Sequence, residues 1–150
     1  MTHMVEVGEK PPVYRQATAE GRLCLQASTI DCIAQGTVKK GNPLEVAKVA
    51  AIQAVKDTPR ILPLCHPIPV TGVDVELRLD GQEVYCQLSV SATYRTGVEM
   101  EALTGVAAAL LTVWDMTKYL EKDAQGQYPE TSLGGIRVVK KIKRAPDSES

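Results

Sequence analysis

The sequence predicts an α+β protein of the ferredoxin-like, split β-α-β type, with helices packed on one face of an antiparallel sheet. Its local patterns follow the order strand, helices, strand, strand, helix, strand. An alternating hairpin stands in the middle, and a long apolar helical run lies on each side of it. The chain has 150 residues, 44% of them hydrophobic, which is enough for one core. We therefore expect residues 1–150 to form a single domain.

The first third of the chain predicts an arm, a strand and a short helix. Residues 1–17 lack periodicity and contain Pro11-Pro12, which indicates a partly mobile N-terminal arm. Residues 19–26 are typical of a short strand. Ser28 then favours the start of a helix that stops at Gly36.

A buried helix and a stiff loop follow. Asn42 can cap the helix, Pro43 suits its first position, and the run Leu44 to Val55 is nearly all apolar. Thr58-Pro59 predicts its end. Residues 61–72 hold three prolines, which exclude a regular helix or a central strand, yet the segment is apolar. We expect a loop packed against the body of the protein.

The second half predicts a hairpin, a long helix and a last strand. Apolar and polar residues alternate over 73–80 and 84–92 around the Asp80-Gly81 turn. A helix is expected from Val98 to Glu121, a polar loop over 123–132 and a strand over 136–142. Residues 144–150 are expected to form a polar tail.

Charge and composition exclude several classes of protein. The 17 Lys and Arg nearly balance the 18 Asp and Glu, which argues against a dedicated nucleic-acid or membrane-surface binder. Five Tyr, one Trp and no Phe make a stacking platform for single-stranded nucleic acid hard to build. No segment approaches the roughly 20 apolar residues of a membrane span, and the N-terminus does not resemble a signal peptide. A cytoplasmic protein is therefore expected.

The four cysteines are scattered through the chain without a Cys-x-x-Cys pair. This spacing indicates neither a zinc site nor a disulfide framework. We interpret them as buried free thiols and expect no metal.

One face of the long helix carries Glu101, Thr104, Ala108, Leu111, Asp115 and Lys118 at steps of three and four. Two interpretations remain open: a helix–helix seam with solvated ends, or an acid/base pair formed by Asp115 and Lys118. Glu101 and Asp115 are 14 positions apart, about 21 Å along a helix. If both are functional, there are two sites, or one site shared across an isologous interface between two copies.

Residues 36–72 are locally basic and also contain His66. Lysines around a stiff loop suit a polyphosphate; the alternative is a set of solvated lysines and one core histidine. Neither a P-loop nor a Rossmann glycine motif is present.

Longer motifs resemble a known family. They are Leu-Pro-Leu-Cys-His-Pro at 62–67, Thr-Gly-Val-Glu-Met-Glu-Ala-Leu-Thr at 96–104, Trp-Asp-Met-Thr-Lys at 114–118 and Lys-Lys-Gly at 39–41. Over roughly residues 4–143 the chain resembles the cyclic pyranopterin monophosphate synthases, the molybdenum cofactor biosynthesis protein C family. Glu6 stands where the family usually has Asp, and the C-terminal tail also departs from bacterial members.

The resemblance implies a reaction and an assembly. The family converts 3′,8-cyclo-7,8-dihydroguanosine 5′-triphosphate, the product of an upstream radical enzyme, to cyclic pyranopterin monophosphate and releases pyrophosphate. It needs no metal or redox cofactor for this step. Its fold is ferredoxin-like, and it forms a homohexamer, a trimer of dimers, with the active site at the dimer interface.

The resemblance also implies roles for individual residues. Asp115, Lys118 and Lys40 match catalytic positions. The other matches are substrate-binding positions: Leu64, Cys65 and His66 in one loop, Met100 and Glu101 with neighbouring Glu99 in a second segment, Lys56 and Lys141 near the phosphates, and Arg15 from the arm.

Two other functions remain as alternatives. One is a catalytically silent nucleotide-binding accessory module of the upstream radical enzyme. The other is an RNA-binding ferredoxin-like domain, which the shortage of aromatic residues disfavours.

Overall fold

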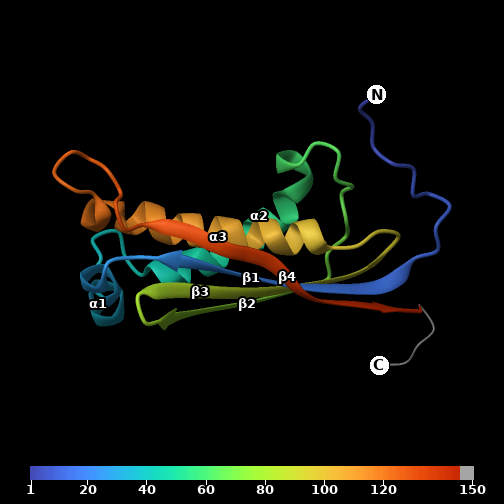
Figure 1. The fold of residues 1–150 in the computed structure, drawn as a ribbon. Coiled ribbons are helices and arrows are strands. Elements are labelled where there is room, and N and C mark those ends of the chain that lie inside the picture. Colours follow the sequence, from blue (N-terminus) through green and yellow to red (C-terminus); the bar gives the residue numbers. More distant parts are fainter. Residues whose placement is uncertain (146–150) are drawn as a thin grey trace.

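The computed structural model describes residues 1–145 and contains four strands and three helices (Figure 1). Their order confirms the predicted one. In chain order the elements are β1 (Val13–Cys24), α1 (Ala27–Gln35), α2 (Pro43–Ile61), β2 (Gly72–Asp80), β3 (Glu83–Tyr94), α3 (Glu99–Glu121) and β4 (Ser132–Arg144).

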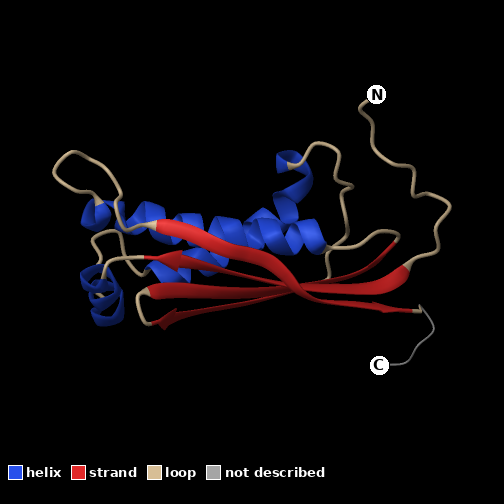
Figure 2. Cartoon of the chain, in the orientation of Figure 1, coloured by secondary structure: helices blue, strands red, loops and turns tan. Residues whose placement is uncertain are grey.

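The four strands form one antiparallel sheet in the order β2-β3-β1-β4. The chain passes from β1 through α1 and α2 to β2, and β3 lies between these two strands. This is the split β-α-β arrangement, so the predicted ferredoxin-like fold is confirmed. Figure 2 shows α2 and α3 above one face of the sheet, with α1 at one end.

An aliphatic core lies between the sheet and the two long helices. Leu23, Leu88 and Val90 of the sheet and Val106 and Leu110 of α3 are all 0% exposed. Because the chain contains no Phe, closely packed Leu, Val and Ala side chains fill the core.

Gly105 sets how closely α3 approaches its neighbours. A Cβ at this position would lie 2.6 Å from Leu88 Cδ1 and 2.8 Å from Val55 Cγ2, distances that real side chains do not tolerate. The missing side chain therefore lets α3 lie against β3 and α2 at once.

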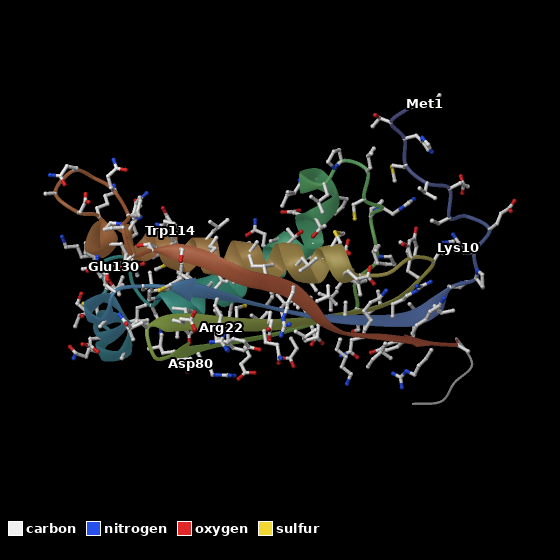
Figure 3. The ribbon with its side chains drawn as sticks, in the orientation of Figure 1. Met1, Lys10, Arg22, Asp80, Trp114 and Glu130 are labelled. Carbon is white, nitrogen blue, oxygen red and sulfur yellow. The ribbon has the colours of Figure 1, made fainter. Side chains whose placement is uncertain are left out.

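The other face of the sheet is polar. The guanidinium carbons of Arg22 and Arg78 lie 4.7 and 4.3 Å from the centre of the Tyr85 ring. Arg22 also pairs with Asp80 at 3.0 Å, on the side of the sheet away from the helices (Figure 3). Helices therefore cover only one face.

Two strands are longer than predicted. β1 begins at Val13, so the arm covers residues 1–12 and not 1–17. β4 covers 132–144 and pairs with β1 from Cys24↔Ser132 to Tyr14↔Arg144. Pairing on both sides of β1 supplies backbone partners where the sequence has no clear alternation. Residue 144, predicted as tail, thus belongs to a strand; residues 146–150 lie outside the described part.

Two smaller expectations are also corrected. α2 does not end at Thr58 but continues to Ile61 with Pro59 in its last turn, where the missing N–H costs a single helical bond. Of the four free cysteines only Cys86 is buried, and the other three are half-buried.

Candidate active site

Most of the predicted site residues fall into two clusters at opposite ends of α3. The Asp115 cluster comprises Lys40, Asp115 and Lys118. The Glu101 cluster comprises Leu64, Cys65, His66, Glu99, Met100, Glu101 and Lys141. The helix separates Glu101 from Asp115 by about 21 Å. Figure 3 shows the separation: Trp114 lies toward one end of α3, and Lys10 of the arm lies beyond the other.

In the Asp115 cluster a carboxylate lies between two ammonium groups. Lys118 Nζ is 3.0 Å from Asp115 Oδ1, one helical turn away, and Lys40 Nζ is 3.5 Å from Oδ2. The hydrogen bond from Lys118, followed by the charges of Lys118 and Lys40, lowers the pKa of Asp115. Asp115 in turn raises the pKa of Lys118. Asp115 and Lys118 therefore each stabilise the charged form of the other.

This cluster is open to solvent. The Asp115 side chain is 59% exposed, and Leu111, one turn earlier on the same face, is 52% exposed. Of the residues on this helix face, Leu111 and Asp115 are exposed, Thr104 and Ala108 are half-buried and Glu101 is buried, so the second half of the face is not a helix–helix seam within residues 1–145. A ligand that reaches Asp115 can exchange protons with it directly.

At the other end of α3, Leu64, Cys65, His66, Glu99 and Met100 of the Glu101 cluster line a cavity of ≈ 750 Å³, while Glu101 and Lys141 stand outside its lining. Its walls are the loop Leu62–His66 with Ile68, the turn before α3, the first turn of α3, and the arm through His3, Val5, Val7 and Lys10. The His66 Nε2 atom lies 2.7 Å from the carbonyl oxygen of Val5, which joins the proline-rich loop to the arm. Ile68 and Val70 of the loop pack against the core as predicted, whereas Pro63, Leu64 and Pro67 are exposed.

Glu101 is the most buried ionisable group of this cluster, at 1% exposure. The Cys65 thiol donates a hydrogen bond of 3.6 Å to Oε2, and Oε1 is buried without a partner among the described residues. Burial raises the pKa of Glu101. Burial, together with the Glu101 charge, raises the pKa of Cys65 to about 11, so Cys65 is a thiol and not a thiolate. A buried carboxyl oxygen without a donor is costly and is typical of functional sites.

β4 joins the Glu101 cluster through Lys141. Its Nζ lies 3.1 Å from Glu99 Oε1 at the start of α3. With Lys10 of the arm, this lysine gives the cavity region ammonium groups on two different segments, and His66 adds a ring nitrogen. Such an arrangement suits an anionic ligand.

The structure does not bring two predicted residues into either cluster. Lys56 is exposed on α2, and Arg15 lies on β1 with its Nε buried without a partner among the described residues. Neither lines the cavity or contacts Asp115 within residues 1–145. Their substrate-binding roles remain predictions.

Three aromatic residues near Asp115 were not predicted. The Tyr119 hydroxyl accepts a hydrogen bond of 2.8 Å from the backbone N–H of Lys39. The rings of Trp114 and Tyr128 meet edge to face at 5.3 Å. Tyr119 stands four residues after Asp115, on the same helix face, and this spacing is a signal that identifies it.

Residues 1–145 contain no group of three or more His, Cys, Asp and Glu side chains placed to hold a metal ion. No helix in that range is both long and apolar enough to span a membrane.

Comparisons with known proteins identify the family. The model of the MoaC family matches residues 4–143. This chain belongs to the MoaC family. Family membership confirms the resemblance on which the catalytic expectation rests.

Curated MoaC relatives match nearly the whole chain. A protein of Methanothermobacter thermautotrophicus, named a probable cyclic pyranopterin monophosphate synthase accessory protein, is 56% identical over 93% of this chain and 88% of its own. Proteins of Thermococcus onnurineus and Thermococcus kodakarensis, both named probable cyclic pyranopterin monophosphate synthases, are 55% and 54% identical over 93% of this chain and 90% of their own.

Proposed function

We propose that this MoaC protein is a cyclic pyranopterin monophosphate synthase, a lyase of molybdenum cofactor biosynthesis. It converts 3′,8-cyclo-7,8-dihydroguanosine 5′-triphosphate to cyclic pyranopterin monophosphate and releases pyrophosphate. The observation that carries the proposal is Asp115, an exposed carboxylate with Lys118 at 3.0 Å and Lys40 at 3.5 Å. The names of the Thermococcus relatives support the same reaction.

The Asp115 cluster supplies the proton transfers. Rearranging the ring system of a guanine-derived nucleotide requires protons to be removed from some atoms and added to others. Asp115 moves these protons, and Lys118 and Lys40 hold its charge and orient its two oxygens. A bound substrate that displaces water strengthens these interactions.

The Glu101 cluster binds the substrate. Its cavity of ≈ 750 Å³ lies within the range of nucleotide-sized ligand sites. Leu64, Cys65 and Met100 contribute to its lining, His66 offers a ring nitrogen to the substrate, and Lys141 neutralises phosphate charge and the charge that develops on pyrophosphate. We extend the binding role to Lys56 and Arg15 on the family resemblance alone.

One site then needs both ends of α3. Because about 21 Å separates the clusters within one chain, we propose that the Asp115 cluster of one copy faces the Glu101 cluster of a second. Leu111, an exposed apolar side chain on the same helix face between the clusters, supports a dimer along α3, and the family resemblance supports a hexamer of three such dimers. The free thiols of the four cysteines support a cytoplasmic location, alongside the radical enzyme that makes the substrate.

Turnover by the purified protein tests the proposal. Wild-type protein should consume the cyclised dihydronucleotide and release one pyrophosphate for each pterin formed. Asp115→Asn should lower kcat at least about 100-fold, the size expected for loss of a general acid/base. Asp31→Asn, which changes an exposed carboxylate on α1, is the matched control. Normal turnover in Asp115→Asn with an intact fold would refute the catalytic assignment.

A second candidate is the catalytically silent accessory module, which the name of the Methanothermobacter relative favours. It predicts tight binding of the triphosphate nucleotide without any pterin product. The same assay, followed by calorimetric titration with the substrate, separates the two functions.

A further inference from the structure

Tyr119 joins the last turns of α3 to a segment that lies 80 positions earlier in the chain. Its hydroxyl accepts the Lys39 backbone N–H at 2.8 Å, and Lys39 Nζ lies 5.2 Å from the centre of its ring. Lys39 thus contacts Tyr119 twice: its backbone N–H bonds the hydroxyl, and its ammonium group lies over the ring. The adjacent residue, Lys40, is the one that reaches Asp115.

The segment between α1 and α2 has few other attachments near Lys40. On one side Val38 is buried at 6% exposure, and on the other Asn42 caps α2 through the backbone N–H groups of Leu44 and Glu45. Between these points the backbone turns through Gly41, at φ 117°, with a bond of 3.1 Å from Gly41 N to Val38 O. Lys39 and Lys40 lie at the exposed tip of this turn. The Tyr119 hydroxyl therefore ties the backbone of the tip to α3, beside the side-chain contacts of Lys40 with Asp115.

Lys40 reaches Asp115 only at the limit of hydrogen-bonding distance. Its Nζ lies 3.5 Å from both Asp115 Oδ2 and the Asp115 carbonyl oxygen, at the outer limit of a hydrogen bond. A displacement of the tip by about 1 Å away from α3 takes both contacts beyond this limit unless the lysine side chain rearranges, and misplacements of this size are costly in catalysis. Asp115 and Tyr119 are four residues apart on one helix, so the same rigid element presents the carboxylate and fixes the lysine that faces it.

We propose that Tyr119 is a positioning residue for Lys40: its hydroxyl holds the Lys39–Gly41 tip so that the Lys40 ammonium faces Asp115. This inference rests on the proposed catalytic role of Lys40 and adds a residue that acts through it. Tyr119 itself has no proton-transfer role.

The experiment compares Tyr119→Phe with Lys40→Ala and the double variant. Tyr119→Phe removes only the hydroxyl and keeps the ring beneath Lys39. Loss of one hydrogen bond of this kind predicts a three- to tenfold lower kcat with unchanged KM. In the Lys40→Ala background the same change should have no further effect, because the group being positioned is already gone.

A second readout is independent of turnover. Exchange of the Lys39 amide hydrogen should be several-fold faster in Tyr119→Phe, because the amide loses its acceptor. If the wild type shows no turnover, the proposed function fails while amide exchange still tests whether Tyr119 holds the tip. Tyr85→Phe is the matched control, since it removes a bonded hydroxyl on the polar face of the sheet, and it should leave kcat unchanged.

Two outcomes overturn the positioning role. One is a wild-type kcat and wild-type Lys39 exchange in Tyr119→Phe. The other is a loss of kcat of equal size with and without Lys40, which would show that Tyr119 acts on the site by some other route.

Discussion

The two ends of α3 carry carboxylates of opposite character. At its start Glu101 is 1% exposed, has a thiol for its neighbour, and has its pKa raised by burial. Near its end the Asp115 side chain is 59% exposed, is bonded to Lys118 and faced by Lys40, and has its pKa lowered by them. One helix therefore presents a carboxyl group for which burial favours the neutral form and another that cations keep charged.

The proposed division of roles, with binding at one cluster and chemistry at the other, follows this difference. Glu101 is buried and does not line the cavity itself; it accepts the thiol hydrogen bond of Cys65, a residue that does line it. The exposed carboxylate between two lysines is in contact with solvent until a bound ligand excludes water from it. Neither end has the features of the other, which is the reason for proposing that two copies combine them.

Mixing variants from the two ends gives the largest expected effect. His66→Ala and Asp115→Asn, each inactive alone, should recover about one quarter of wild-type activity when co-expressed in equal amounts. Random pairing leaves one intact site in half of the dimers if each site uses both copies. The measurement is kcat per site in the co-purified protein.

The control for this mixture is a pair of variants from the same end. Lys40 and Asp115 contact each other within one chain, so Lys40→Ala mixed with Asp115→Asn should recover nothing. Equal recovery in both mixtures, or in neither, would argue against a site shared between the two ends.

Glu121 tests whether the exposed end is nevertheless firmly anchored. It is 0% exposed and accepts hydrogen bonds from Gln26 N at 3.1 Å, from Thr131 Oγ1 at 2.6 Å and from the Thr29 hydroxyl. Glu121→Gln places an amide N–H₂ among these donors and leaves at least one unsatisfied, so the free energy of unfolding should fall by about 1–3 kcal/mol.

Urea denaturation measures this effect, and Glu130→Gln is its control. Glu130 is an exposed residue of the loop that follows α3 (Figure 3), so its substitution should change the free energy of unfolding by less than about 0.5 kcal/mol. Equal stability of the two variants would mean that Glu121 does not anchor this end.

The smallest expected effect is the pH dependence of stability at the two ends. Because the folded-state pKa of Glu101 is raised, its contribution to stability is complete below its ordinary pKa and is lost as the pH rises through the raised value. Glu101→Gln should therefore gain thermal stability relative to wild type as the pH rises from about 4.

Asp115→Asn should show the opposite trend. The folded-state pKa of Asp115 is lowered, so its contribution is present above its ordinary pKa and is lost as the pH falls through the lowered value. Thermal unfolding of both variants across this range, against wild type, tests the contrast directly. Parallel pH profiles for the two variants would contradict the opposite pKa shifts of Glu101 and Asp115.

Local patterns explain which parts of the fold could be predicted. The hairpin of β2 and β3 and the long helix α3 were predicted because alternation and helical periodicity lie within short windows of sequence. The extents of β1 and β4 depend on each other, since residues 13–18 and 143–144 become strand only by pairing across the sheet. Nothing near these residues along the chain indicates that.

The same limit applies to the site. The Asp115–Lys118 pair follows from a spacing of three residues on a helix. Lys40 approaches Asp115 from 75 positions away, and only the family resemblance pointed to it. The sequence does not indicate the anchoring role of Glu121, because a glutamate near a helix end is usually solvated and its burial depends on hydroxyls from α1 and from the residue before β4.

The close packing of Gly105 against Leu88 and Val55 fixes the middle of α3, so the length of the helix sets the distance between the two clusters. The helix is held at its middle and cannot slide, so each added residue would lengthen the span between the clusters by about 1.5 Å and rotate one end by about 100° relative to the other. Insertions in the loop after Glu121 do not change the distance between the two clusters. Length variation in this protein should therefore be tolerated after α3 and not within it.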